Sequence, residues 1–271
     1  MIDGGKYLRL LSKFQPAARR CLHCASTTYS INGKPSFCNF CEQYTGSGVE
    51  QAAETPFSAV RSQIDANGWD AAEKTASQLI KGNKDPEQLY LIGVFYHELS
   101  TIRFQSRDYN QMGFMEKNAV NIRDSLDLTM KWKECFFKVI KIVGDELQGN
   151  VQVDPELVFI KLVSELRLRR FVEAAATLKV LQNLDKHGIL IGYAQLAYNV
   201  ERNTKQAEAS LASMLPQSEI NTYYYLAKYL AKNKKLREAE LLIELLGKTS
   251  EVLSSRELLY KIRLAQEASK M

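Results

Sequence analysis

The chain has 271 residues, 36 lysines and arginines against 31 aspartates and glutamates, and 45% apolar side chains. This composition excludes collagen-like, disordered and disulfide-scaffold classes. No run approaches the roughly 18 apolar residues of a membrane-spanning helix, so we expect no membrane partner. The N-terminus, Met1 to Lys6, has no basic segment followed by an apolar one. We therefore expect a cytoplasmic, reducing location, with thiols that are free or metal-bound.

The cysteines are concentrated near the N-terminus, where four of the five lie in one window of the sequence. Two Cys-x-x-Cys pairs joined by a hairpin can bring four thiolates into a tetrahedron around one structural Zn²⁺. The run Thr28 to Ile31 between the pairs is β-rich and is followed by Asn32-Gly33, a strong hairpin signal. The sequence therefore predicts a small β module with one zinc ion. Its predicted ligands are Cys21, Cys24, Cys38 and Cys41.

Other uses of the paired cysteines are weaker. A redox dithiol accounts for only one pair, and haem attachment needs a histidine where Ala25 and Glu42 stand. Rubredoxin-type iron is the main competitor, but it usually has glycine at those same two positions. His23 is a candidate fifth ligand, although a side chain between two such cysteines usually points to solvent.

Over about residues 15 to 45 the cysteine pattern resembles that of zinc ribbons, a class found in adaptor and nucleic-acid-binding proteins. Because all four predicted ligands are sulfur, no coordination position is left for water, and we expect a structural metal, not a catalytic one. The resemblance leaves two partner classes open. The module docks a protein, or its aromatic and basic side chains contact RNA or DNA.

A linker is expected after the cysteine-rich module. The segment 46–55 contains Gly46-Ser47-Gly48 and polar residues, without the apolar periodicity of a helix or strand. Beyond it the pattern is helical. The predicted division is therefore a zinc ribbon of residues 1–45, a linker, and a helical domain of residues 56–271.

Three helix starts carry clear signals. Asp85-Pro86 and Asp154-Pro155 each place a capping carboxylate before a first-turn proline. The run Ser254 to Glu257 has the spacing of a capping box. Helices are predicted to begin near 86, 155 and 255.

Helical hairpins repeat in the C-terminal half. Aligning them on the small residue that opens each second helix places Ala174, Ala207 and Ala239 in register, with intervals of 33 and 32 residues. This resembles the tetratricopeptide repeat, a helix–turn–helix unit of about 34 residues in which a small residue lets two helices approach closely. The resemblance implies a mostly α fold, a tetratricopeptide-like solenoid. Other α-solenoids are compatible with so degenerate a repeat.

Traces of the repeat continue toward the N-terminus. Gly68 to Ala72 resembles a turn and the start of a second helix, and Leu89 to Tyr96 resembles a first helix. The partner expected for that first helix, through Asp108-Tyr109, comes about seven residues late. Elongated or irregular helices are therefore predicted from roughly 99 to 150, and the number of units there is left open.

The tetratricopeptide resemblance also implies a binding surface, because ligands of that family lie along the concave face made by the first helices. The matching positions here are Tyr90, His97, Phe159, Arg167, Asn199, Tyr224, Lys228 and Lys232. This face is aromatic and basic and suits a protein or peptide partner with acidic groups. The alternative is that the lysines form a solvated face and the aromatic rings belong to the core.

Within residues 221–232 the register assigns Tyr223, Leu226 and Leu230 to the core and the lysines to the groove. Four tyrosines at positions 223, 224, 225 and 229 cannot all lie on one core stripe, which favours the binding interpretation.

No catalytic motif is present: the sequence has no nucleophile triad spacing, phosphate loop, zinc-protease helix or EF-hand. Cys135, among apolar residues on a predicted helix, is expected to be a buried inert thiol. We therefore predict a non-enzymatic adaptor that binds a protein partner through the concave face, with the zinc ribbon as a second docking module. The alternative is a nucleic-acid-associated regulator whose ribbon contacts RNA or DNA. Oligomeric state is left open.

Overall fold

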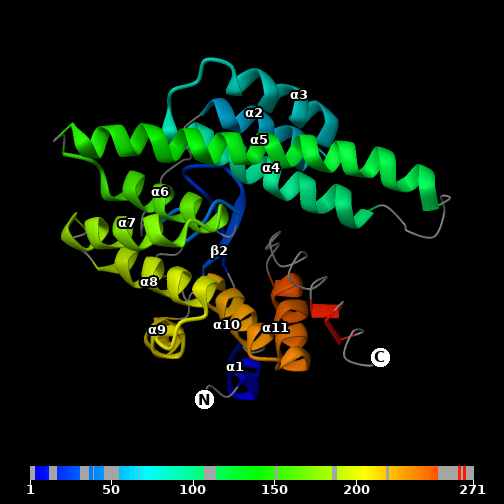
Figure 1. The fold of residues 1–271 in the computed structure, drawn as a ribbon. Helices are drawn as coiled ribbons and strands as arrows, with labels where there is room; N and C mark the ends of the chain where they lie inside the picture. Colours follow the sequence, from blue (N-terminus) through cyan, green and yellow to red (C-terminus); the bar gives the residue numbers. More distant parts are fainter. Residues whose placement is uncertain are drawn as a thin grey trace. The chain divides into compact units, whose positions relative to one another are not determined.

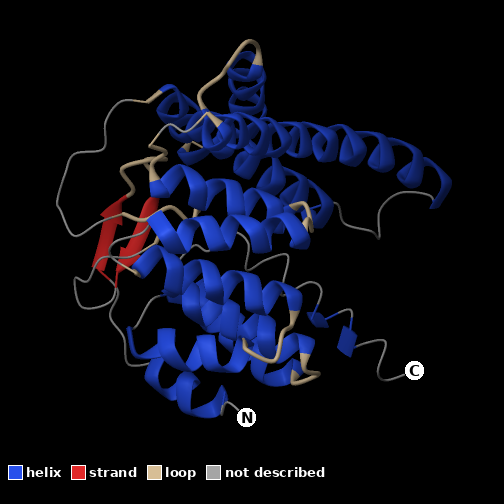
Figure 2. Cartoon of the chain, turned by 60° about the vertical axis from the view of Figure 1, so that its left-hand side comes forward, coloured by secondary structure: helices blue, strands red, loops and turns tan. Residues whose placement is uncertain are grey.

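The computed structural model describes residues 4–11, 17–30, 37–38, 40–45, 55–66, 68–106, 114–149, 152–184, 188–217, 220–249, 262–263 and 265–266. These residues are mostly helical, as the sequence predicts, with one small antiparallel sheet (Figures 1 and 2). No helix among them is both long enough and apolar enough to cross a membrane.

The elements follow one another in this order: α1 (Gly4–Leu11), β1 (Ala17–Arg20), β2 (Thr27–Ser30), α2 (Pro56–Asp65), α3 (Trp69–Ile80), α4 (Pro86–Ser106), α5 (Phe114–Gln148), α6 (Pro155–Arg167), α7 (Phe171–Leu184), α8 (Ile189–Arg202), α9 (Ala207–Met214), η1 (Leu215–Gln217, a 3-10 helix), α10 (Ile220–Lys232) and α11 (Leu236–Thr249).

Two of the three predicted helix starts are confirmed. α4 begins at Pro86, and the carboxylate of Asp85 accepts a hydrogen bond from the backbone N–H of Glu87 at 2.9 Å. α6 begins at Pro155, and Asp154 caps it in the same way. Each carboxylate satisfies a backbone donor that the first helical turn leaves unpaired. The third predicted start, near residue 255, lies outside the described residues.

Contacts divide the chain into two compact units. One unit consists of Met1–Ala53 together with Asp154–Met271, and the other is Glu54–Val153. The N-terminal segment therefore belongs with the C-terminal helices. The predicted bounds of 1–45, 46–55 and 56–271 stay a prediction, but the contacts place the division elsewhere.

In the unit that holds the C-terminal helices, α6 pairs with α7, α8 with α9, and α10 with α11 (Figure 1). The three hairpins have the same turn. The residue in the left-handed conformation is Arg169 (φ 59°) in the first, Asn203 (φ 53°) in the second and Lys234 (φ 63°) in the third. In each turn the following backbone N–H donates to the carbonyl five residues earlier, at 2.8, 2.9 and 2.9 Å. The turn thus recurs at intervals close to those of the sequence repeat.

The aligned alanines lie where the paired helices meet. Ala174, Ala207 and Ala239 have no exposed surface, as the sequence register predicts. In the other unit, Ala72 occupies the same place after the turn between α2 and α3 and is equally buried. There the N–H of Gly68 donates to the carbonyl five residues earlier at 2.8 Å. Close approach of two helices requires such small side chains.

The long helices expected between 99 and 150 are present as α4, with 21 residues, and α5, with 35. They pair as an antiparallel hairpin within the unit Glu54–Val153. Gly93 on α4 permits this approach, because a Cβ there would lie only 2.7 Å from a ring carbon of Phe136 on α5. The segment around Asp108-Tyr109, which was expected to continue a repeat, lies outside the described residues.

Candidate metal centre

The four predicted ligands come together. The sulfur atoms of Cys21, Cys24, Cys38 and Cys41 all lie within 4.8 Å of one another, and all four side chains are buried. The Sγ atoms of Cys21 and Cys41 are 3.7 Å apart, and those of Cys24 and Cys38 are 3.6 Å apart. Four sulfurs at ~2.3 Å from a central Zn²⁺ in a tetrahedron are about 3.8 Å apart, whereas a disulfide would need about 2.05 Å. The cluster can therefore bind a metal ion.

The backbone around the sulfurs consists of two equivalent turns, which we call the first knuckle (residues 20–27) and the second knuckle (residues 37–44). In the first, the N–H of Ala25 donates to the carbonyl of Cys21 at 3.0 Å; in the second, the N–H of Glu42 donates to that of Cys38 at 2.9 Å. Ala25 and Glu42 have positive φ angles, 55° and 60°. These are the positions where a rubredoxin-type site usually has glycine. Here the same conformation forms without it.

Paired β segments hold each knuckle closed. β1 and β2 are antiparallel and place Arg20 opposite Thr27 across the first knuckle, and an isolated bridge places Phe37 opposite Tyr44 across the second. The predicted strand 28–31 corresponds to β2, whereas β1 was not foreseen. The predicted turn at Asn32-Gly33 lies outside the described residues.

Hydrogen bonds within the cluster favour negative charge on one sulfur. Burial opposes ionisation of Cys38, but hydrogen bonds with the other three cysteines and with Ser26 hold its pKa well below the usual value. The Ser26 hydroxyl lies 3.2 Å from that sulfur. Burial, and then the hydrogen bonds with the other cysteines, raise the pKa of Cys41 well above its usual value. Deprotonating all four thiols in this buried place requires a cation among them.

His23 lies in the first knuckle but does not belong to the sulfur cluster. Its Nε2–H donates to the backbone carbonyl of Tyr44 at 3.0 Å, and the same nitrogen is 3.9 Å from the carboxylate of Glu156 on α6. His23 therefore links the two knuckles to each other and to a helix of the same unit.

The second knuckle is docked on the first helices of the C-terminal hairpins. The ring of Phe37 stacks on Tyr193 of α8, with centroids 3.9 Å apart and planes 15° apart. The same ring lies 5.8 Å from Phe159 of α6. All three rings are buried, so the module shares one aromatic core with α6 and α8.

Polar contacts reinforce this docking. The Glu42 carboxylate pairs with Arg167 of α6 at 3.3 Å and accepts a hydrogen bond from the Tyr225 hydroxyl of α10 at 3.4 Å. The Asn221 side-chain amide donates to the carbonyl of Cys38 at 3.1 Å. Burial, and next the Glu42 carboxylate, raise the pKa of Tyr225. The main chain of Cys38, a candidate metal ligand, is thereby fixed to α10.

The predicted partner-binding residues are divided between the two units, and several of them have internal contacts. Phe159 is buried and Arg167 contacts Glu42, so both serve the docking of the cysteine module. Tyr90 and His97 belong to the other unit, where Tyr90 is buried beside Phe136 and His97 lies 5.3 Å from the ring of Trp132. The burial of Tyr90 and Phe159 argues against direct contact of either with a partner.

The remaining four predicted residues lie on α8 and α10. Asn199 has an internal role, because its side chain bonds to Ser210 and Thr204 at 2.8 Å each. Tyr224 and Lys228 are partly exposed and adjacent, with the ammonium 5.7 Å from the ring centroid.

Lys228 pairs with Glu201 of α8, and Lys232 donates to two backbone carbonyls at the end of α8. The alternative of a simply solvated lysine face does not describe these two side chains, since both ammonium groups contact α8.

The tyrosines of α10 show why the sequence argument missed the docking. Tyr223 is buried in the hairpin together with Leu226, as the register predicts. Tyr225 is also buried, but on the side that meets the cysteine module. The surplus of tyrosines therefore marks a helix with two covered sides. Asn221 belongs to this second side, and only the spacing 221, 225 could have indicated it.

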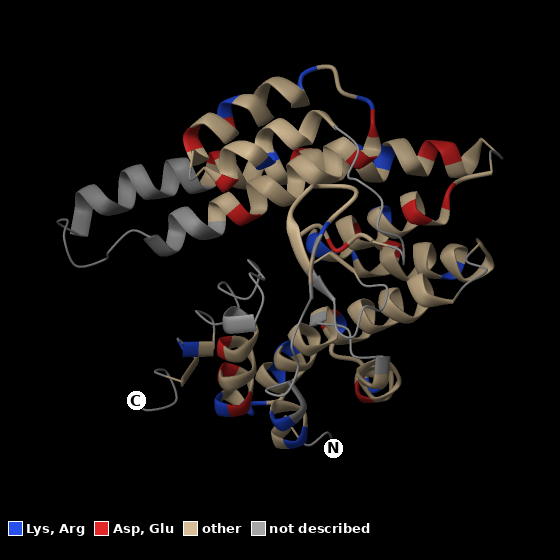
Figure 3. Cartoon of the chain, turned by 180° about the vertical axis from the view of Figure 1, so that it is seen from behind, with Lys and Arg blue, Asp and Glu red and all other residues tan. Residues whose placement is uncertain are grey.

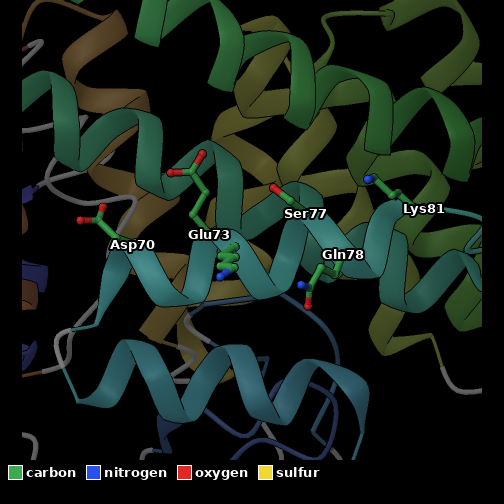
Figure 4. A pocket seen from close by; sticks show the side chains of 6 residues that line it. Asp70, Glu73, Ser77, Gln78 and Lys81 are labelled. Carbon is green, nitrogen blue, oxygen red and sulfur yellow. The ribbon is translucent and has the colours of Figure 1, made fainter.

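Two other features could form a site: a cavity along α3 and the thiol of Cys135. A cavity of about 340 Å³ lies along α3, where Asp70, Glu73, Ser77, Gln78 and Lys81 point from one helix and its end (Figure 4). The side chains that line this cavity carry charges of both signs, and Glu73 already pairs with Lys131 at 3.1 Å. They therefore do not form a set of groups directed at one ligand. Cys135 is buried as predicted, and burial raises the pKa of its thiol to about 12, which makes it a poor nucleophile.

Comparison of the chain with protein-family models, with curated proteins and with solved structures gave no match. The resemblances to zinc ribbons and to tetratricopeptide repeats therefore stay predictions. The geometry of the cysteine cluster and of the repeated hairpins carries the functional argument.

Proposed function

We propose that the protein is a non-enzymatic adaptor in which a tetratricopeptide-like array of helical hairpins binds a protein partner. The observation that carries the proposal is the common turn of α6/α7, α8/α9 and α10/α11, with a buried alanine three or four residues after the N–H that closes each turn. Repeated hairpins of this kind stack side by side and offer extended surfaces to other proteins.

The metal in this proposal is a single structural zinc in a ribbon-like module. Four thiolates with closed tetrahedral spacing suit zinc and leave no position for a substrate. The residues that would hold the ion are Cys21, Cys24, Cys38 and Cys41. When bound, zinc supplies cross-links between the two knuckles of a segment that is too small to have a large core of its own. Elemental analysis should find about one zinc per chain; stoichiometric iron would contradict this assignment.

The docked module changes where the partner binds. Phe37, Glu42 and the backbone of Cys38 already cover part of the face formed by α6, α8 and α10. A partner therefore has to use what stays accessible beside them: the outer part of α8 and α10 near Tyr224, together with the partly exposed residues Leu22 and His23 of the first knuckle. The proposed surface is smaller than the whole groove that the sequence suggested.

Nucleic-acid binding has less support than protein binding. Lys and Arg residues are interspersed with Asp and Glu over the described helices and do not form one basic field (Figure 3). The second knuckle is also used internally, through Phe37, which might otherwise have stacked on a base. Sequence-independent nucleic-acid binding depends on a positive surface that neutralises phosphates.

The zinc-loaded full chain, used as bait in an extract of its native cell and then reconstituted with the captured protein, tests the proposal. Hydrogen exchange of the purified complex should show new protection in α8, α10 and the first knuckle. The variant Tyr224→Ala should weaken capture, whereas Val172→Ala, at an exposed position of α7 outside that surface, should not. Protection elsewhere, or tight RNA or DNA binding that falls steeply with salt, would replace the adaptor proposal.

A further inference from the structure

A second candidate site lies at the turn ends of the C-terminal hairpins, away from the cysteine cluster. A cavity of about 500 Å³ is lined there by charged side chains from α8, α10 and the turn after α6, and by apolar side chains. Its charged groups are Arg169, Lys228, Lys232 and Glu201. This volume is within the range of small-molecule sites, which combine an apolar wall with a few polar groups.

The three cations exceed the acid by two charges. Lys228 pairs with Glu201. Lys232 donates to the carbonyls of Val200 at 2.7 Å and Glu201 at 2.5 Å, where the C-terminal end of α8 carries partial negative charge. The guanidinium of Arg169 has no hydrogen bond or ion pair with any described residue, although the residue lines the same cavity. Its guanidinium is available to a ligand.

The positive charge in the cavity affects the pKa of one of the lysines that line it. Burial lowers the pKa of Lys232, and the charges of Lys228 and Arg169 lower it further against the attraction of Glu201. A bound anion would relieve this repulsion. An anion placed between a guanidinium and an ammonium also receives charge-assisted hydrogen bonds, which are stronger than neutral ones.

The backbone turn places Arg169 beside the cavity. Its φ of 59° lies in the left-handed region, where glycine or asparagine is favoured over a long side chain. The equivalent turns have Asn203 and Lys234, so the conformation belongs to the turn, and Arg169 is the one of the three that lines this cavity.

The opposite wall is apolar. It includes Phe171 at the start of α7, Leu236 at the start of α11, and Ile262. A ligand that fits both walls has a charged head and a short hydrocarbon tail. We propose that this cavity binds a small organic oxyanion, with its carboxylate or phosphate held by Arg169 and Lys232 and its tail against Phe171, Leu236 and Ile262.

Calorimetric titration of the zinc-loaded full chain tests this site independently of the adaptor proposal, because no protein partner is needed. The probes are hexanoate and hexyl phosphate, with hexan-1-ol lacking the charge and inorganic phosphate lacking the tail. One or both charged amphiphiles should bind, and the ratio of their affinities distinguishes carboxylate from phosphate as the preferred head. Octanoate should bind about fourfold tighter per added methylene until the cavity is filled.

The variant Arg169→Gly should weaken binding about tenfold, as expected for loss of one charged hydrogen-bonding partner. Glycine is favoured at this φ, so the melting temperature should stay equal or rise. Lys234→Gly is the matched control: it removes a cation from a residue with the same backbone conformation two hairpins later, outside the cavity, and should leave binding unchanged.

If Arg169→Gly lowers the melting temperature, Arg169→Asn decides, because asparagine already occupies the equivalent turn at 203. The proposal is wrong if neither amphiphile binds, if hexan-1-ol or inorganic phosphate binds as tightly as they do, or if the folded Arg169 variant binds like the parent chain.

Discussion

The two knuckles have the same backbone conformation, but only the second one is docked on helices. Both close through the same hydrogen bonds, and both place a non-glycine residue at positive φ. The first knuckle has Arg20 and Ala25 at the positions where the second has Phe37 and Glu42. Arg20 is exposed, whereas Phe37 and Glu42 are buried against helices. The two Cys-x-x-Cys pairs thus share one backbone conformation, and the side chains next to the cysteines decide which knuckle docks.

Glu42 and Ala25 show the consequence for stability. A left-handed conformation costs a non-glycine residue about 1–2 kcal/mol. Nothing in the described contacts of Ala25 beyond its backbone compensates this cost. The carboxylate of Glu42 does compensate, because it binds both Arg167 and Tyr225.

Loss of the metal should have the largest effect. Cys38→Ser should abolish zinc binding, and structural zinc sites contribute roughly 10 kcal/mol or more to the folding of small modules. Because the second knuckle is packed on α6, α8 and α10, we expect melting of these helices to shift to lower temperature together with the module. Thermal unfolding followed by far-ultraviolet circular dichroism and zinc analysis checks this. Cys135→Ser, at the buried thiol outside the cluster, is the control that should retain zinc.

Phe37→Ala should be the next most damaging change. It removes a ring stacked on Tyr193 in the shared core and should cost about 3–5 kcal/mol of unfolding free energy. The equivalent residue of the first knuckle is Arg20, which is exposed and donates to the carbonyl of Ala25. Arg20→Ala should cost less than about 1 kcal/mol. Equal costs in urea unfolding would show that the two knuckles do not differ in docking.

A change in a hairpin tests whether the unit can be destabilised without touching either knuckle. Ala239→Leu should cost about 1–3 kcal/mol, because a larger side chain does not fit between α10 and α11. Zinc content should stay near one per chain. Ala231→Leu, at a partly exposed position of α10, should cost less. An unchanged melting temperature for Ala239→Leu would contradict the close packing of this hairpin.

Glycine substitutions at the positive-φ residues should have the smallest effects on stability, and these effects should have opposite signs in the two knuckles. Ala25→Gly should stabilise by about 0.5–1 kcal/mol, since glycine adopts a positive φ without steric cost. Glu42→Gly gains the same relief but loses the Arg167 and Tyr225 contacts, and charged hydrogen bonds contribute about 1.5–3 kcal/mol. It should therefore be net destabilising. Thermal unfolding of the two variants checks this. If both glycine variants melt at a higher temperature than the parent chain, the Glu42 contacts contribute nothing to stability.

The sequence predicted the features that depend on short spacings. Two Cys-x-x-Cys pairs, capping aspartates before prolines and the alanines at intervals near 33 residues are local patterns with direct physical meaning. The docking of the second knuckle joins residues far apart in the chain, such as Phe37 with Tyr193 and Glu42 with Arg167. No local pattern encodes such a pair. The strand β1 was missed for a related reason: Ala17 to Arg20 has little β propensity, and closure of the knuckle holds it in place.

The most direct test of the account is hydrogen–deuterium exchange of the full chain with zinc bound and after chelation. In the proposed arrangement the cluster binds zinc, and the second knuckle holds the cysteine module against α6, α8 and α10. Chelation should therefore raise exchange in the described parts of residues 17–45 and in those three helices, while α2 to α5 keep their protection. Faster exchange confined to the cysteine module, with α6, α8 and α10 unchanged, would contradict the claim that the module and these helices form one core.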